Sequence, residues 1–172
     1  VKTALIFAAL GCDKYSSIAF DKSTRDHTEM IMNDAGFNIS INDNIIVKKS
    51  FINHGIVATV PGDISNASFI IAGAILIPGS NITIKKVLYN KKRLAFITTL
   101  LKMGAQINIY NISKEKNGMQ ACDIDVNYSQ KLSPIHICSD NIIEMIDEIP
   151  IFCIIASFVI GETSIKDAKE LK

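Results

Sequence analysis

The feature that most constrains the fold of this chain is an internal repeat. Residues 3–20 and 67–85 share one pattern: an apolar helix-like run, a small turn and a β-rich segment. In both copies a second helix follows, ends in a glycine (Gly36 and Gly104) and leads into a strand of alternating polarity. A glycine just past the last helical turn suits a left-handed cap, and alternation of Ile with polar residues suits a half-buried strand.

A third copy of the pattern covers residues 151–166 and stops before its second helix. The chain therefore holds two nearly complete copies and part of a third. Repeats of this kind predict stacked α/β units that share a core, and incomplete copies are usually unstable alone. We therefore expect this chain to be cut from a longer polypeptide.

A domain break near residues 58–62 is one interpretation of the place where a strand-like segment, residues 52–60, meets Pro61 and Gly62. Proline ends a strand ladder and glycine permits a turn. An ordinary strand-to-helix turn is the alternative interpretation. The residues alone leave both interpretations open.

The composition excludes several classes of protein. The 172 residues are 48% hydrophobic and carry a net charge of +1, so a real core is possible and the basic surface of a nucleic-acid binder is missing. The longest apolar runs, residues 68–78 and 149–161, are shorter than the roughly 18 to 20 residues that a membrane span needs. The sequence shows no sign of a secretion signal, because no basic segment precedes an apolar stretch with a cleavage site at the start. We expect a soluble, cytoplasmic, globular chain with neither nucleic acid nor membrane as a partner.

The cysteines predict neither disulfides nor a metal site. Cys12, Cys122, Cys138 and Cys153 form no C-x-x-C pair and are expected to be buried free thiols in a reducing cytoplasm. His136 and Cys138 could place two ligands on one face of a strand. Zinc needs four ligands and no second pair lies nearby, so we expect no metal.

Arginine is rare in this chain. Arg25 and Arg93 are the only two, against 16 lysines. Anionic substrates are commonly held by the forked guanidinium of arginine. The chain by itself therefore has few groups with which to hold such a substrate.

Three stretches in order point to a family. Residues 60–69 (VPGDISNASF) with 77–80 (IPGS), residues 24–29 (TRDHTE), and residues 146–150 (IDEIP) followed by Gly-Glu-Thr at 161–163 together resemble 5-enolpyruvylshikimate-3-phosphate synthases. The resemblance covers essentially the whole chain. It implies an α/β (α+β) fold of inside-out βαβαββ repeats in two lobes that close on substrate. Residues 1–58 would end the first lobe, and residues 59–172 would begin the second.

The resemblance also implies a reaction. The family transfers the enolpyruvyl group of phosphoenolpyruvate to the 5-hydroxyl of shikimate 3-phosphate and releases phosphate, without metal or organic cofactor. Addition followed by elimination needs a base for the hydroxyl, an acid for the vinyl carbon and cations for two phosphates. The expected partners are these two substrates, with the missing segments supplied by the same enzyme or by complementary fragments of it.

Asp147 aligns with the aspartate of the family that contacts the 5-hydroxyl and is the usual candidate proton acceptor. Read from the residues alone, Asp147 would instead be the N-cap of the apolar helix that follows it, and both roles can hold at once. We expect the neighbouring Glu148 to be solvated.

Thr24 aligns with the serine of the family that binds the phosphate of shikimate 3-phosphate, and Arg25 aligns with an arginine that could assist. The alternative is a plain helix start, with Asp26 and Glu29 as an aspartate variant of the capping box. The resemblance thus implies catalytic Asp147 and substrate-binding Thr24, Arg25 and Asp147.

The departures from the family pattern imply that the isolated chain is inactive. The NPTRTG stretch of the family has become NKKRLA at residues 90–95, and most substrate-binding groups would lie outside the chain. A non-catalytic remnant or interaction module of a split gene remains an alternative. A fragment of the related UDP-N-acetylglucosamine enolpyruvyl transferase is another, although the matches at residues 24–29 and 146–150 favour shikimate 3-phosphate.

Overall fold

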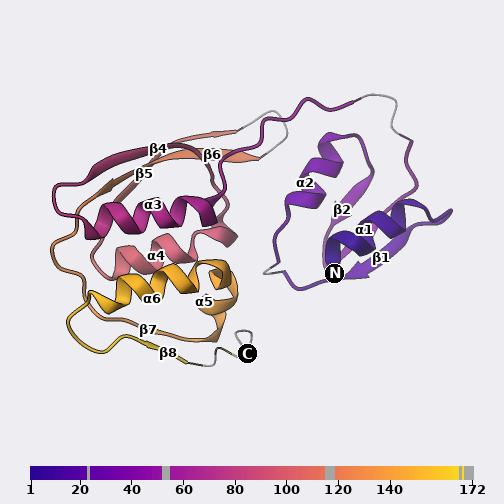
Figure 1. The fold of residues 1–172 in the computed structure, drawn as a ribbon. Coiled ribbons are helices and arrows are strands. Elements are labelled where there is room, and N and C mark those ends of the chain that lie inside the picture. Colours follow the sequence, from indigo (N-terminus) through magenta and orange to yellow (C-terminus); the bar gives the residue numbers. More distant parts are fainter. Residues whose placement is uncertain (23, 52–54, 115–118, 167, 169–172) are drawn as a thin grey trace. The chain divides into compact units, whose positions relative to one another are not determined.

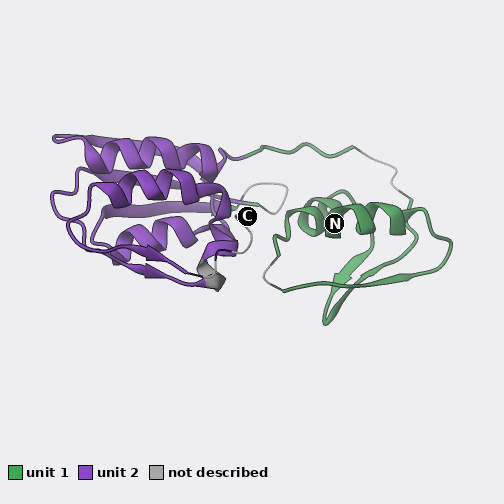
Figure 2. Ribbon diagram, turned by 60° about the horizontal axis from the view of Figure 1, so that its bottom comes forward, with its two compact units in different colours: residues 1–60, 114–119 green, residues 61–113, 120–172 purple. Residues whose placement is uncertain are grey.

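The structure is a computed structural model that describes residues 1–22, 24–51, 55–114, 119–166 and 168. The chain divides into two compact units (Figure 2). Unit 1 consists of Val1–Val60 with Lys114–Met119, and unit 2 consists of Pro61–Ser113 with Gln120–Lys172. The assignment of residues 1–58 and 59–172 to two lobes of one enzyme stays a prediction.

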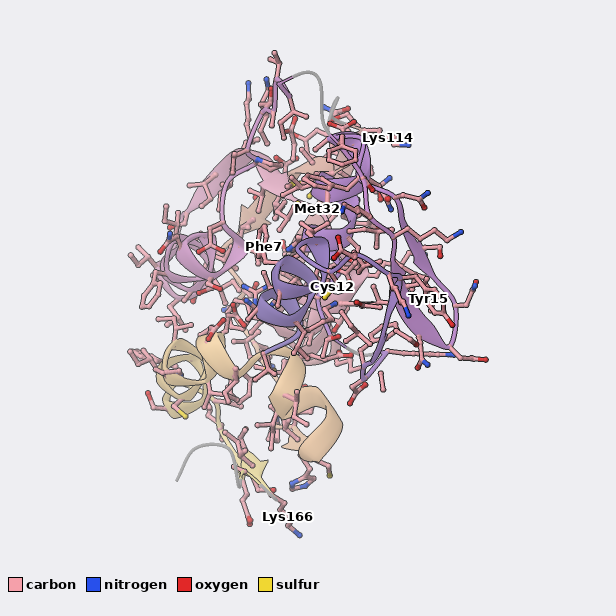
Figure 3. The ribbon with its side chains drawn as sticks, turned by 90° about the vertical axis from the view of Figure 1, so that its right-hand side faces the viewer. Phe7, Cys12, Tyr15, Met32, Lys114 and Lys166 are labelled. Atoms are coloured by element: carbon pink, nitrogen blue, oxygen red, sulfur yellow. The ribbon has the colours of Figure 1, made fainter. Side chains whose placement is uncertain are left out.

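Unit 1 is a small sheet covered by two helices. Its elements are α1 (Lys2–Leu10), β1 (Ser16–Ala19), α2 (His27–Asp34), β2 (Ile39–Ile41) and β3 (Asn44–Val47). The strand order is β1-β3-β2, and β3 pairs antiparallel with both neighbours. Its core holds Ile6, Ala9, Ile18, Met32, Ile39, Ile45 and Val47. Figure 3 marks Met32 in this core and Phe7 on the exposed side of α1.

Unit 2 places its helices inside and its sheets outside. Its elements are α3 (Ile64–Leu76), β4 (Asn81–Leu88), the 3₁₀ helix η1 (Lys91–Arg93), α4 (Ala95–Lys102), β5 (Gln106–Lys114), β6 (Gln120–Asn127), β7 (His136–Ile137), α5 (Ser139–Glu144), the 3₁₀ helix η2 (Ile146–Glu148), α6 (Ile149–Ser157) and β8 (Ser164–Ile165). Helices α3, α4 and α6 lie between the sheet β4-β6-β5 and the pair β7-β8 (Figure 1). This layering is the predicted inside-out α/β arrangement.

The two larger sheets have the same topology. In β1-β3-β2 and in β4-β6-β5, the strand after the first helix pairs with the last strand of the copy. The third copy begins in the same way as the second. Its strand β7, which precedes α6, pairs in parallel with β8, which follows α6, just as Gly62 before α3 bridges in parallel to Val87 in β4. The predicted repeat, with two nearly complete copies and part of a third, is confirmed.

Both predicted glycine caps are present. Gly36 (φ +87°) and Gly104 (φ +96°) follow the C-caps of α2 and α4 in the left-handed region. The next residue in each case donates its N–H to a carbonyl in the last helical turn, Phe37 to Met32 and Ala105 to Leu100, both at 2.9 Å. This is the Schellman arrangement, which ends each helix and turns the chain into its strand.

The strand expected over residues 52–60 and the expected burial of all four cysteines are wrong. Gly55–Val60 forms no strand, and residues 52–54 lie outside the described part of the chain. Of the cysteines, only Cys122 is buried, and its burial raises the pKa of the thiol to about 11. Cys12, which follows α1 (Figure 3), Cys138 and Cys153 are exposed because they lie at helix ends or on an uncovered helix face.

All four cysteines are free. Across the described residues, no group of side chains is suited to hold a metal ion. None of the helices in the same part of the chain is long and apolar enough to cross a membrane.

Candidate active site

One cluster of charged side chains in unit 2 surrounds Arg93, the last residue of η1. The Arg93 side chain is only 7% exposed. Its Nη1 donates to Asp147 Oδ2 at 3.2 Å, and its Nη2 donates to Ser65 Oγ at 2.6 Å. Nη2 also lies 3.6 Å from Glu148 Oε1 and 3.8 Å from Asp63 Oδ1. One guanidinium thus faces three carboxylates and one hydroxyl.

Three helix starts bring these groups together. Asp63 is the N-cap of α3, and its carboxylate accepts from the N–H groups of Ser65 and Asn66, each at 3.2 Å. Asn90 caps η1 in the same way, through the N–H of Lys92 at 2.9 Å. The third start, η2 followed by α6, carries Asp147 and Glu148. The three helix starts thus place Asp63, Asp147 and Glu148 at one end of unit 2.

Glu148 is buried rather than solvated, which corrects the expectation from sequence. Its side chain is 2% exposed, and Oε1 accepts from Ser65 Oγ at 2.5 Å. A buried carboxylate is costly unless it is paired and hydrogen-bonded. Arg93 and Ser65 supply both kinds of partner, so Glu148 can remain inside.

Asp147 does not cap α6. The N-cap position of α6 belongs to Glu148, which makes no side-chain capping bond, and Asp147 lies within η2. Half of the Asp147 side chain is exposed, while Oδ2 is held by Arg93. A half-exposed carboxylate that an arginine holds in place is suited to accept a proton from a bound hydroxyl.

In unit 1, Thr24 and Arg25 lie between β1 and α2. The Thr24 hydroxyl donates to the carbonyl of Asp21 at 2.6 Å. The Arg25 side chain is exposed, and its backbone carbonyl accepts from the amine of Lys2 at the start of α1. The predicted substrate-binding pair therefore lies in unit 1, and Asp147 lies in unit 2.

The capping box that was the alternative interpretation of this segment is absent at the start of α2. Asp26 occupies the N-cap position but makes no side-chain capping bond. Glu29 is buried and turns to Lys2, with 2.6 Å between Oε1 and Nζ. Because the lysine amine is charged, it is a stronger partner for the carboxylate than a backbone N–H.

The sequence reasoning missed Arg93 and Ser65 as members of the cluster. One signal could have found Arg93, because the chain has only two arginines and both stand two residues before the second helix of a repeat. Ser65 stands in the motif at residues 60–69, but nothing in that motif indicates its pairing with Arg93 and Glu148.

The chain is similar to known proteins along its whole length. A family model described as "EPSP synthase (3-phosphoshikimate 1-carboxyvinyltransferase)" matches residues 1–172. The 3-phosphoshikimate 1-carboxyvinyltransferases of Thermodesulfovibrio yellowstonii and Endomicrobium trichonymphae are 42% and 40% identical to it over 175 residues. Each match covers all of this chain and 40% of the relative, so the chain spans about 40% of the length of the curated relatives it matches.

A solved structure agrees with these matches. The EPSP synthase from Acinetobacter baumannii superimposes with a TM-score of 0.88 at 29% sequence identity. The superposition covers 98% of this chain and 38% of that protein.

Proposed function

Because the family model matches all 172 residues, the chain belongs to the EPSP synthase family, and we propose that it forms part of an enolpyruvyl transferase. The reaction moves the enolpyruvyl group of phosphoenolpyruvate to the 5-hydroxyl of shikimate 3-phosphate. The hydroxyl oxygen bonds to C2 of phosphoenolpyruvate while C3 gains a proton. Loss of one proton from the resulting C3 methyl group and of phosphate from C2 then restores the double bond.

We propose that Asp147 accepts the proton of the 5-hydroxyl. The single observation that carries this role is the half-exposed Asp147 carboxylate, which Arg93 holds at 3.2 Å where helix starts meet. A positioned base of this kind contributes about 10²- to 10⁴-fold to a rate. Glu148 and Asp63 are less suited, because Glu148 is buried and Asp63 caps α3.

Thr24 and Arg25 are proposed to bind the phosphate of shikimate 3-phosphate. A hydroxyl beside an exposed guanidinium is a suitable pair for an anion. The Thr24 hydroxyl donates to the Asp21 carbonyl, so binding a phosphate exchanges that hydrogen bond for a bond to phosphate oxygen. We also propose a cytoplasmic location, because the four free thiols, three of them exposed, suit a reducing compartment.

A hybrid enzyme tests the function. In it, residues 1–172 replace the segment that they match in the Thermodesulfovibrio yellowstonii relative. Phosphate release from phosphoenolpyruvate and shikimate 3-phosphate is measured for the hybrid, for the chain alone and without protein. We expect turnover only in the hybrid, because catalytic groups that act as a unit lose activity together.

Asp147→Asn should lower kcat of the hybrid by about 10²- to 10⁴-fold. The matched control is Glu162→Gln, which removes an exposed carboxylate of the same unit and should leave the rate unchanged. An inactive hybrid, or an Asp147→Asn hybrid as fast as its parent, contradicts the proposal.

A further inference from the structure

The two arginines of the chain occupy equivalent places in two copies of one fold. Arg25 stands two residues before α2, and Arg93 stands two residues before α4. Each lies between the first strand and the second helix of its copy, and the sheets of the two copies have the same strand order. The two side chains therefore share a backbone location but differ in their surroundings.

Those surroundings give the arginines different chemistry. Arg25 is exposed, whereas Arg93 is buried. Three carboxylate groups lie within 3.8 Å of the Arg93 guanidinium: Asp147, Glu148 and Asp63. An incoming phosphate would have to displace these carboxylates, and Glu148 would lose its charge partner inside the unit. Arg93 is therefore poorly placed to bind an anionic substrate.

The hydrogen bonds at Arg93 form a chain in which each group donates to the next. Nη2 donates to Ser65 Oγ, and Ser65 Oγ donates to Glu148 Oε1. These bonds fix one side of the planar guanidinium, while Nη1 on the other side donates to Asp147 Oδ2. The half-buried Ser65 and the buried Glu148 thus determine where the guanidinium holds the half-exposed Asp147.

We propose that Arg93 is a positioning residue, which together with Ser65 and Glu148 holds the Asp147 carboxylate in its orientation for proton transfer. This inference rests on the proposed role of Asp147 as proton acceptor. Displacing a reacting group by about 1 Å can cost about 10²-fold in rate, so a fixed carboxylate matters for kcat. Arg93 acts through Asp147 and makes no contribution of its own to substrate affinity.

The first test uses the 172-residue chain and no catalysis. With only two arginines, the Nε–H signals in a ¹⁵N NMR spectrum are assigned with Arg25→Lys and Arg93→Lys. We expect slow proton exchange and restricted rotation for the Arg93 guanidinium, and fast exchange for Arg25. Asp147→Asn should release part of that restriction. Two equally mobile arginines, or an Arg93 signal unchanged by Asp147→Asn, overturn the proposal.

The second test separates positioning from binding in the hybrid enzyme. Arg93→Lys keeps the positive charge but loses the planar guanidinium that donates from two nitrogens. We expect kcat to fall about 10- to 100-fold, with KM for both substrates within twofold of the parent hybrid. Lys91→Gln is the matched control, because it removes an exposed charge from the same 3₁₀ helix and should change neither parameter. Arg25→Gln should instead raise KM for shikimate 3-phosphate.

The outcomes of the two tests are distinguishable. A raised KM with unchanged kcat in Arg93→Lys would make Arg93 a binding residue and overturn the inference. Equal unfolding midpoints of parent and variant hybrids exclude a purely structural cause for a lower kcat. A parent hybrid without activity counts against the proposed function, and the arginine spectrum of the chain then decides whether the Arg93 network exists.

Discussion

At the scale of single residues, Asp123 joins three strands of the unit 2 sheet. It lies on the central strand β6, where Oδ1 accepts from the backbone N–H of Lys86 in β4 at 3.0 Å. Oδ2 accepts from Asn111 Nδ2 in β5 at 3.1 Å. Lys86 (φ +53°) and Asn111 (φ +50°) both have left-handed backbones, and the register of β4 shifts at this point. One carboxylate therefore supports irregular backbone on both neighbouring strands.

This role predicts an acid dependence of stability. The Lys86 backbone N–H, followed by the Asn111 amide, lowers the pKa of Asp123 below its ordinary value of 3.8. A lowered folded-state pKa stabilises the fold above the unfolded-state pKa, and the stabilisation is lost as pH falls through the folded-state pKa. We expect Asp123→Asn to be less stable than the parent at pH 6, with a difference that shrinks below about pH 4. Urea unfolding at a series of pH values measures this.

Asp34→Asn is the control for Asp123→Asn, because it removes an exposed carboxylate at the end of α2. Its effect on the urea midpoint should not follow the same pH course. A loss in Asp123→Asn that stays constant from pH 6 to pH 3 would assign the effect to packing instead of charge.

The same scale shows what sequence reasoning can and cannot find in the site. Asp147 could be nominated because it stands in a recognisable motif, and its catalytic role stays a proposal. Arg93 lies 54 residues from Asp147, and Ser65 lies 83 residues from Glu148. At such separations, the residues around each partner give no indication of the pairing. Glu148 was expected to be solvated because nothing beside it in sequence indicates the buried arginine that neutralises it.

At the scale of elements, the sequence predicts most helices and strands, because periodic apolar residues and terminal glycines act locally. The segment at Gly55–Val60 is the exception. Its apolar residues suggest a strand, yet Val57 and Val60 are about 80% exposed, and within the described part of the chain no strand pairs with them. A strand needs a partner that supplies hydrogen bonds, and the pattern of one segment does not reveal whether a partner is present.

Two glycines of unit 2 should respond to alanine with opposite signs. Gly73 lies inside α3, and an added Cβ there would meet no atom within 4 Å, so Gly73→Ala should stabilise the chain by about 0.5–1 kcal/mol. Gly104 has φ +96° after α4, where any side chain is strained. We expect Gly104→Ala to destabilise by about 1–2 kcal/mol.

Each of these variants is the control for the other, because both add one methyl group to the same unit. Urea unfolding followed by circular dichroism gives the two free energies of unfolding. Shifts of the same sign would contradict the backbone argument.

At the scale of the whole molecule, each unit has a core of its own. The core of unit 2 is built from helices α3 to α6 and strands of its sheets, whereas the core of unit 1 contains seven buried residues among those that the structure describes. A small core leaves less burial to offset the entropy of ordering the chain. We therefore expect unit 1 to open more readily than unit 2, although Thr24 and Arg25 of the proposed phosphate site lie in it.

Matched cavities in the two cores test this difference. Ile45 in unit 1 and Ile71 in unit 2 are both fully buried, and truncation of a buried isoleucine to alanine costs about 2–5 kcal/mol. Hydrogen exchange should show that Ile45→Ala speeds exchange in β1, β2 and β3 and leaves α3 and β6 protected. Ile71→Ala should do the reverse. If either variant speeds exchange in both units equally, the chain opens as one cooperative body. The proposed phosphate site and the proposed base would then gain and lose their structure together, and separate stabilisation of unit 1 could not rescue substrate binding.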